Sequence, residues 1–328
     1  MEMTWEEWKA MKKDLRRRFS GAGWTVLCYF LMVNAAVMLC MFLESFNAIL
    51  KQMLAEGSGQ VIPRIAGSES AWGYFLAAAL GMLILMLWKK PRYFGEQILA
   101  RGKPMTVGAF FSVMCVFLGC QFLSQMVLSV AEIVLNFCGF TILPGMEALA
   151  VDMDDFGMFL YACVLAPVTE EILFRGVVLR KLLPFGKRFA ILCSAVTFGL
   201  FHGNLVQAPF ACLVGLILGY VAVEYNICWA MLLHMINNLV MADMLYRLTA
   251  FLPVMVANTV VWLVFFGFAV AALVILIVRY KDILSWKEKE QIYKVYVSCF
   301  FRSTGVIVFG LAMVSMMVYT FGLLITPI

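Results

Sequence analysis

The chain has 328 residues, of which 64% are hydrophobic and 14% are charged, and its formal net charge is +5. A soluble domain carries about 25% charged residues, so this chain has too little charge to cover the surface of a soluble protein. Its apolar residues form runs of about 20, the length that crosses the roughly 30 Å hydrocarbon layer of a membrane as a helix. This composition excludes a soluble enzyme, a disulfide-rich secreted scaffold and a nucleic-acid-binding protein. It predicts an all-α fold, a polytopic transmembrane helical bundle.

Apolar runs separated by charged or Gly/Pro-rich breaks predict eight or nine membrane spans. In chain order, the nine candidate runs are about 22–43, 71–88, 105–131, 156–180, 189–203, 207–223, 227–246, 255–278 and 303–325. The fifth and sixth runs are short, and Gly203 and Asn204 between them leave room for only a tight turn.

A basic amphipathic segment precedes the first run. Between Thr4 and Phe19, apolar residues recur at helical spacing while six Lys and Arg residues take the remaining positions. Such a helix lies on an anionic lipid surface, and Thr4 and Glu7 have the spacing of an N-terminal capping box. The chain is therefore expected to divide into four regions. They are an interfacial helix (1–20), a three-span region (21–155), a four-span catalytic core (156–246) and a two-span region (247–328).

Lys and Arg residues are unevenly distributed between alternate loops. If the N-terminus is cytoplasmic, the inner segments hold 21 of the 25 Lys and Arg residues and the outer segments hold three. Cytoplasmic loops of membrane proteins are enriched in these residues, so we expect an integral membrane protein with a cytoplasmic N-terminus. The short loops and many methionines favour the plasma membrane of a bacterium over the endoplasmic reticulum.

The fourth run contains ionisable residues, which are costly inside a membrane span and therefore suggest a function. Glu170 and Glu171 are adjacent, and Arg175 follows them. Glu171 and Arg175 are four residues apart on one helix face, so they can form an ion pair. Glu170 is rotated by about 100° from Glu171 and has no local partner, which makes it a candidate for proton transfer.

The chain has only two histidines, His202 and His234, which lie in the fifth and seventh runs. Asn238 follows His234 by one helical turn and therefore lies on the same helix face. Together with Glu170, these three side chains could converge on one cavity at membrane depth. An acid/base group beside hydrogen-bond donors is the arrangement that peptide-bond hydrolysis needs.

These residues form three motifs that resemble those of a known family. The motifs are Glu-Glu-x-x-x-Arg at 170–175, Phe-x-x-x-His at 198–202 and His-x-x-x-Asn at 234–238. In this order, each on its own apolar run, they resemble the motifs of the CAAX prenyl protease and bacteriocin-processing family, also called the CPBP or Abi family of intramembrane proteases. The resemblance covers about 156–246. It implies a helical-bundle endopeptidase whose active site lies within the membrane and opens to the cytoplasmic side.

The resemblance also implies a role for each motif residue. Glu170 and His202 would activate a water molecule for attack on the scissile carbonyl. His234 and Asn238 would stabilise the tetrahedral oxyanion. Phe198 has no catalytic role in this scheme and is expected to pack.

Glu171 with Arg175 would hold the site together.

Members of the family have been described both as metalloproteases and as glutamate-dependent proteases. A zinc ion held by Glu170, His202 and His234 has suitable ligand chemistry. The chain has no His-Glu-x-x-His helix, which favours metal-independent action, and no cofactor is certain.

Simpler interpretations stay open for the individual residues. Glu171 and Arg175 could form a purely structural ion pair, and each histidine could make a hydrogen bond between helices. The third run carries a polar stripe that could bond neighbouring helices or line a substrate path. It consists of Gln121, Gln125, Ser129 and Glu132.

The function expected from these observations is hydrolysis of a peptide bond in a membrane-associated peptide or protein. The resemblance implies a prenylated C-terminus, a bacteriocin leader or a signalling peptide as substrate, and nothing in the sequence chooses among them. A proton- or ion-coupled carrier would also place carboxylates and histidines at the membrane midplane. A third alternative is an immunity or scaffold protein that keeps the fold without the activity. The other expected partner is membrane lipid, and nucleic acid is not expected.

Overall fold

The computed structural model describes residues 4–55, 71–89, 93, 95, 102–148, 154–240, 244–284 and 290–328. Most of these residues are helical, which confirms the all-α class. The longer helices are α1 (Trp5–Ala55), α2 (Ala71–Lys89), α4 (Val107–Phe137), α9 (Lys187–Phe201), α10 (Gln207–Glu224), α11 (Ile227–Leu239), α13 (Val254–Leu284), α14 (Glu290–Phe301) and α15 (Thr304–Leu324). The shorter ones are α5 (Leu143–Ala148), α6 (Phe156–Leu160), α7 (Ala166–Glu171), α8 (Arg180–Leu182) and α12 (Leu245–Thr249).

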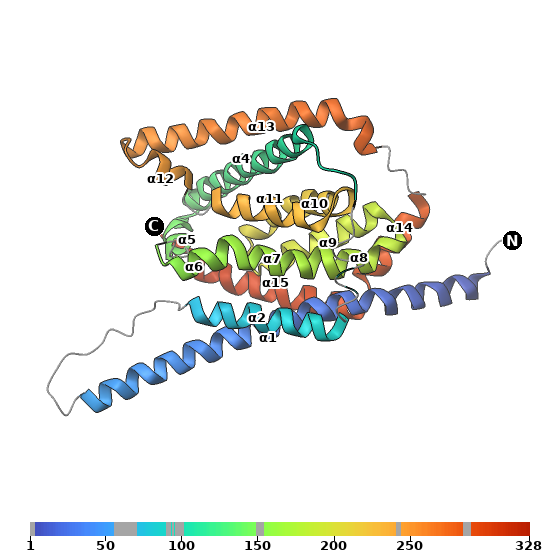
Figure 1. Ribbon diagram of the computed structural model, residues 1–328, viewed down its shortest axis with the longest axis horizontal. Helices are drawn as coiled ribbons and strands as arrows, with labels where there is room; N and C mark the ends of the chain where they lie inside the picture. Colours follow the sequence, from blue (N-terminus) through green and yellow to red (C-terminus); the bar gives the residue numbers. More distant parts are fainter. Residues whose placement is uncertain are drawn as a thin grey trace.

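The helices form a layered bundle (Figure 1). Helix α13 packs along α4 on one side, and α1 packs against α2 and α15 on the other side. Helices α7, α9, α10 and α11 lie between these layers. Two short strands, β1 (Phe140–Thr141) and β2 (Thr326–Pro327), pair antiparallel and join the C-terminus to the segment after α4.

Five of the described helices are long and apolar enough to cross a membrane, namely α1, α4, α10, α13 and α15. Helices α2 and α11 are also apolar but shorter, and they coincide with the second and seventh runs of the sequence. The polytopic helical bundle is therefore confirmed. The expected number of eight or nine spans, and the division of the chain into four regions, stay predictions.

The basic amphipathic segment and the first apolar run are joined in one helix, α1. The Thr4 N–H donates to Glu7 Oε2 at 2.8 Å and the Glu7 N–H donates to Thr4 Oγ1 at 3.3 Å, so the capping box is confirmed. The interfacial helix and the first run, which the sequence analysis treats as separate segments, thus share α1, which runs on without interruption for 51 residues. A helix of this length extends for about 77 Å, so part of it lies outside the roughly 30 Å hydrocarbon layer.

The apolar face of the first part of α1 packs on protein. Leu15 and Phe19 are buried, and the Phe19 ring lies 4.9 Å from the Phe185 ring and 5.1 Å from the Phe189 ring, centroid to centroid. The interfacial helix was expected to turn this face toward lipid, and at these two residues that expectation is wrong. The position of the segment relative to the membrane surface stays a prediction.

Basic segments gather at one end of the bundle, on the right in Figure 1, where the N-terminus, the start of α4, α8 and α14 lie. At this end Glu224 Oε2 accepts from Lys103 Nζ at 2.7 Å, and Glu224 Oε1 accepts from Lys187 Nζ at 2.8 Å. The hydrogen bond to Glu224 raises the pKa of Lys103 above its ordinary value. These contacts tie the segment before α4 to the ends of α9 and α10.

Helices α1 and α15 cross at two glycines, Gly23 and Gly305. The Gly305 N–H donates to Ser20 Oγ at 2.8 Å, and a Cβ atom on Gly305 would clash with the Ser20 carbonyl oxygen. Gly305→Ala is expected to lower the free energy of unfolding by about 1–3 kcal/mol, the usual effect of overpacking, in a denaturation experiment in detergent. Gly310→Ala is the matched control, because a Cβ atom there meets open space and alanine favours a helix over glycine. Equal effects of the two substitutions would contradict the close crossing.

Candidate active site

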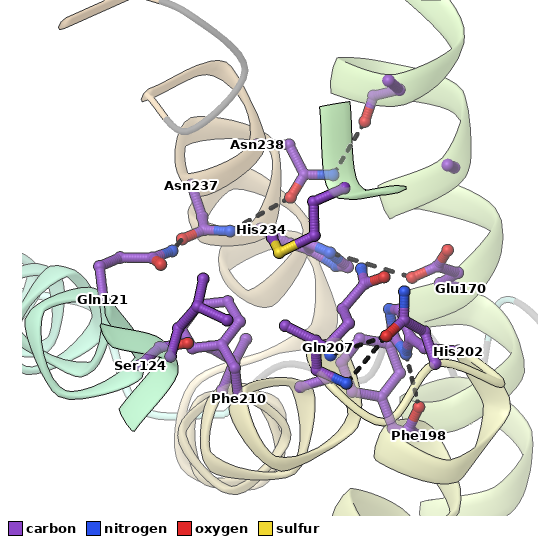
Figure 2. A pocket seen from close by; sticks show the side chains of 18 of the residues that line it. Gln121, Ser124, Glu170, Phe198, His202, Gln207, Phe210, His234, Asn237 and Asn238 are labelled. Atoms are coloured by element: carbon purple, nitrogen blue, oxygen red, sulfur yellow. Dashed lines mark hydrogen bonds and ion pairs between the residues drawn. The ribbon is translucent and has the colours of Figure 1, made fainter. Parts of the chain in front are cut away.

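The four residues expected to act in catalysis line one cavity of about 510 Å³. Glu170 lies on α7, His202 directly follows α9, and His234 and Asn238 lie on α11. Figure 2 shows their side chains around the same space. The structure therefore brings together residues that are up to 68 positions apart in the sequence.

The helix that carries the two carboxylates is not a regular α-helix. Helix α7 lies between two π-helical segments, Tyr161–Leu165 and Ile172–Leu179. π-Helical turns are rare and frequently occur at functional sites. The sequence reading expected one ordinary helix over this run, because hydrophobic periodicity does not separate the two forms over so few residues.

A proline in this helix leaves one backbone carbonyl without its usual partner. In the π-helical segment, the Ala166 N–H donates to the Tyr161 carbonyl, five residues earlier. The next bond in that register would run from residue 167 to the Ala162 carbonyl, but Pro167 has no N–H. The Ala162 oxygen instead accepts from Asn238 Nδ2 at 2.8 Å.

Glu171 and Arg175 form the ion pair that their spacing predicts, and both side chains are fully buried. Arg175 Nη1 donates to Glu171 Oε1 at 2.7 Å, and Arg175 Nη2 donates to the Gly215 carbonyl at 3.2 Å. The same Glu171 Oε1 lies 3.0 Å from His234 Nδ1. Because a carboxylate oxygen accepts, His234 Nδ1 carries the proton of this bond. The buried pair thus contacts α11 and holds the His234 ring in one orientation.

Glu170 has a partner of possible opposite charge on another helix. His234 Nε2 lies 3.9 Å from Glu170 Oε2. The Glu170 side chain is 19% exposed, whereas that of Glu171 is 0% exposed. Of the two adjacent carboxylates, Glu170 therefore faces the cavity and Glu171 faces the protein interior.

The tautomer of His202 follows from its hydrogen bond to the backbone. His202 Nδ1 lies 2.9 Å from the Phe198 carbonyl oxygen. A carbonyl can only accept, so Nδ1 carries the proton and Nε2 of the neutral ring carries the lone pair.

Phe198 packs against the charged and titratable groups of the site. Its ring centroid lies 4.9 Å from that of His202 and 5.7 Å from that of His234. The Arg175 guanidinium carbon lies 4.2 Å from the same ring centroid. Phe198 therefore fills the space between these side chains.

Two further amides extend the site from Asn238. Asn237 Nδ2 donates to Asn238 Oδ1 at 3.2 Å, and Gln121 Nε2 donates to Asn237 Oδ1 at 2.6 Å (Figure 2). Sequence reasoning missed Asn237, although it follows His234 by three residues and so lies on the same side of α11.

The polar stripe on α4 has more than one role. Gln121 and Gln125 line the cavity, and Gln121 also bonds a neighbouring helix, so both interpretations apply to it. Glu132 accepts from the Ile142 N–H at 3.1 Å and is structural. Ser129 is exposed.

The α9–α10 turn forms one wall of the cavity. Gly203 has a φ of 58°, in the left-handed region that favours glycine. Asn204 Oδ1 accepts from the Val206 N–H at 2.8 Å. The tight turn expected from Gly203 and Asn204 is therefore confirmed, and it directs the chain back into α10 immediately after His202.

The cavity lies away from the basic end of the bundle. Its lining includes Asn204, Val206 and Gln207 from the α9–α10 turn and Leu324 from the end of α15. Lys187 lies at the opposite end of α9, which has 15 residues and is therefore about 22 Å long. The sequence analysis expects the basic end to be cytoplasmic and the site to open to the cytoplasm. No single orientation of the bundle in the membrane meets both expectations, because the cavity and the basic end lie at opposite ends of α9.

A second cavity of about 510 Å³ adjoins the first and lies between α4 and α10. Most of its lining is apolar, including Leu123, Val127 and Leu213. Both cavities are lined by Ser124, Leu128, Val206 and Phe210. The site therefore borders an apolar groove on the side of α4.

The residues do not form a ligand set for zinc in this arrangement. A catalytic zinc ion needs three protein ligands and an open position. Among the described residues, no three His, Cys, Asp or Glu side chains are grouped to hold an ion. Glu170, His202 and His234 nevertheless line one cavity.

Part of the chain is similar to a known protein family. Residues 153–240 match the family model of type II CAAX prenyl endopeptidases described as Rce1-like. The chain matches no curated protein and no solved structure. The matched residues include the whole of α7, α9, α10 and α11, whereas Gln121 on α4 lies outside them.

Proposed function

We propose that the protein is an intramembrane endopeptidase that uses Glu170, His202, His234 and Asn238, because residues 153–240 match the Rce1-like family model. The family supports a protease-type enzyme that acts in a membrane. The observation that carries the residue assignment is the single cavity lined by all four side chains. Titratable groups that share a cavity with hydrogen-bond donors are the arrangement expected of a hydrolase site.

In the proposed mechanism, Glu170 and His202 activate a water molecule. Glu170 faces the cavity, and His202 offers the Nε2 lone pair because its Nδ1 proton is held by the Phe198 carbonyl. Glu170 accepts a proton as the water oxygen attacks the scissile carbonyl carbon. The same proton then passes to the leaving amine as the C–N bond breaks.

His234 and Asn238 are proposed to stabilise the oxyanion. His234 Nδ1 donates to Glu171, and Nε2 faces Glu170 and the cavity. Nε2 donates to the oxyanion in the doubly protonated form of the ring, in which both nitrogens carry a proton. One N–H of the Asn238 amide bonds the Ala162 carbonyl, which leaves the second for the oxyanion. Donors held in place before the reaction stabilise the developing charge most effectively.

The substrate is proposed to be a membrane-associated peptide or protein. The apolar groove between α4 and α10 supports this, because it gives an apolar segment a path from lipid to the site. A prenylated C-terminus, a leader peptide and a signalling peptide all fit this description.

The proposed location is a bacterial plasma membrane with the N-terminus in the cytoplasm. The basic segments gathered at one end of the bundle support this orientation. The cavity then lies in the outer half of the membrane, so substrates are expected to reach it from that half or from lipid.

The test is incubation of the purified full-length chain, in detergent, with a library of prenylated and unmodified peptides, with and without a chelator. We expect cleavage of a subset of peptides that persists in the chelator. Activity lost in the chelator and restored by Zn²⁺ would overturn the metal-independent mechanism. A folded chain that cleaves no peptide would overturn the protease assignment and favour a carrier or a non-enzymatic protein.

A further inference from the structure

The amide side chains beside the site have a fixed direction. An amide oxygen accepts and an amide NH₂ group donates, so the partner of each end fixes which way the amide points. Here the last acceptor is the Ala162 carbonyl, a backbone group that cannot reverse. It requires the NH₂ group of Asn238, which leaves Asn238 Oδ1 toward Asn237.

The same argument continues to α4. Asn238 Oδ1 accepts from Asn237 Nδ2, so Asn237 Oδ1 points away and needs a donor. Gln121 Nε2 supplies it at 2.6 Å. Gln121 is 1% exposed and Asn237 is 5% exposed. Because leaving a buried polar group unpaired is unfavourable, each hydrogen bond favours the same direction for all three amides.

We infer that Gln121 is a positioning residue that, through Asn237, holds the Asn238 amide with its NH₂ group at the Ala162 carbonyl. This rests on the proposed function, in which the second N–H of Asn238 donates to the oxyanion. A reversed Asn238 amide would place its oxygen against the Ala162 oxygen and would turn the donor away. We call the hydrogen-bonded series Gln121–Asn237–Asn238 the amide relay. The relay extends the site to α4, a helix outside the matched segment 153–240.

Gln121→Met removes the donor but keeps the length of the side chain. We expect kcat to fall about 10-fold, less than the roughly 100-fold expected when an oxyanion donor itself is lost, with KM nearly unchanged. Thermal stability should fall but the chain should still fold, because the buried Asn237 Oδ1 loses its donor. The assay uses the full-length chain in detergent and the library peptide that the wild type cleaves best. A kcat within twofold of wild type would overturn the inference.

Gln121→Glu gives a readout that a purely structural role would not produce. A protonated carboxyl donates its O–H to Asn237 Oδ1, whereas the ionised form can only accept and opposes that oxygen. The ratio of its kcat to that of wild type should therefore rise as the pH falls. Taking the ratio cancels the titration of Glu170, His202 and His234, which line the cavity in both proteins. A ratio independent of pH would contradict the relay.

Gln125 provides the matched control, since it is also a glutamine of α4, lies one turn away and lines the same cavity. In a double-mutant cycle, Gln121→Met should cost less than twofold in kcat once Asn238→Ala is present. Gln125→Met should have the same effect with and without Asn238→Ala. Wild-type activity in Asn238→Ala would overturn the proposed oxyanion role, whereas an impaired Asn238→Ala with a normal Gln121→Met would overturn only the relay.

Discussion

Glu170→Gln should lower kcat for peptide cleavage by about 10²–10⁴-fold, the usual contribution of a general acid or base. Glutamine keeps the size of the side chain but cannot accept the proton of the attacking water. Because the Glu170 side chain is 19% exposed and faces the cavity, the substitution should leave the fold intact. The measurement is steady-state cleavage of a library peptide, together with thermal unfolding of the same sample.

Glu132→Gln is the matched control for this experiment. Glu132 is a glutamate of the apolar helix α4, is buried and accepts from the Ile142 N–H. It does not line the cavity that Glu170 faces. It should keep kcat within a few-fold of wild type. Full cleavage by folded Glu170→Gln would remove Glu170 from the mechanism, and equal losses in both variants would point to a general effect on the bundle.

Arg175→Met should lower the free energy of unfolding by about 3–5 kcal/mol, the usual result of removing one partner of a buried ion pair. It leaves the fully buried Glu171 carboxylate with His234 as its remaining partner. The measurement is denaturant unfolding in a single detergent. Arg18→Met is the control, since Arg18 pairs with Asp14 at 2.7 Å on the surface and exposed pairs contribute about 0–1 kcal/mol.

The double substitution Glu171→Leu with Arg175→Met separates stability from positioning. Apolar replacement of a whole buried pair is often neutral or stabilising, so the double variant should regain most of the stability lost in Arg175→Met. The double variant should be inactive, because His234 Nδ1 no longer has the Glu171 carboxylate as its acceptor. A stable double variant with wild-type cleavage would show that Glu171 and Arg175 serve the fold alone.

The spacing of ionisable residues was sufficient to predict several contacts. The Glu171–Arg175 pair follows from helical periodicity, and it forms although Arg175 lies in the π-helical segment Ile172–Leu179. The four cavity residues were placed together because charged and polar groups in an apolar chain avoid lipid and gather where they can bond one another.

Other features depend on contacts that no single segment contains. The Glu170–His234 contact joins two helices, so Glu170 lacked a partner only within its own run. Asn237 was missed because its role comes from Gln121, which is 116 positions away. The continuity of α1 was also not predicted. Leu15 and Phe19 have the pattern of a surface helix, and their burial depends on residues far away in the sequence, such as Phe185 and Phe189.

The π-helical segments beside α7 make the geometry of the site depend on the exact number of residues in this helix. An i→i+5 bond encloses one residue more than the i→i+4 bond of an α-helix. Deleting one residue from Tyr161–Leu165 would let that segment close as an ordinary α-helix. The residues before the deletion would then rotate by about 100° relative to α7, and a carbonyl other than that of residue 162 would face Asn238. Insertions and deletions in this helix are therefore constrained as strictly as substitutions of its carboxylates.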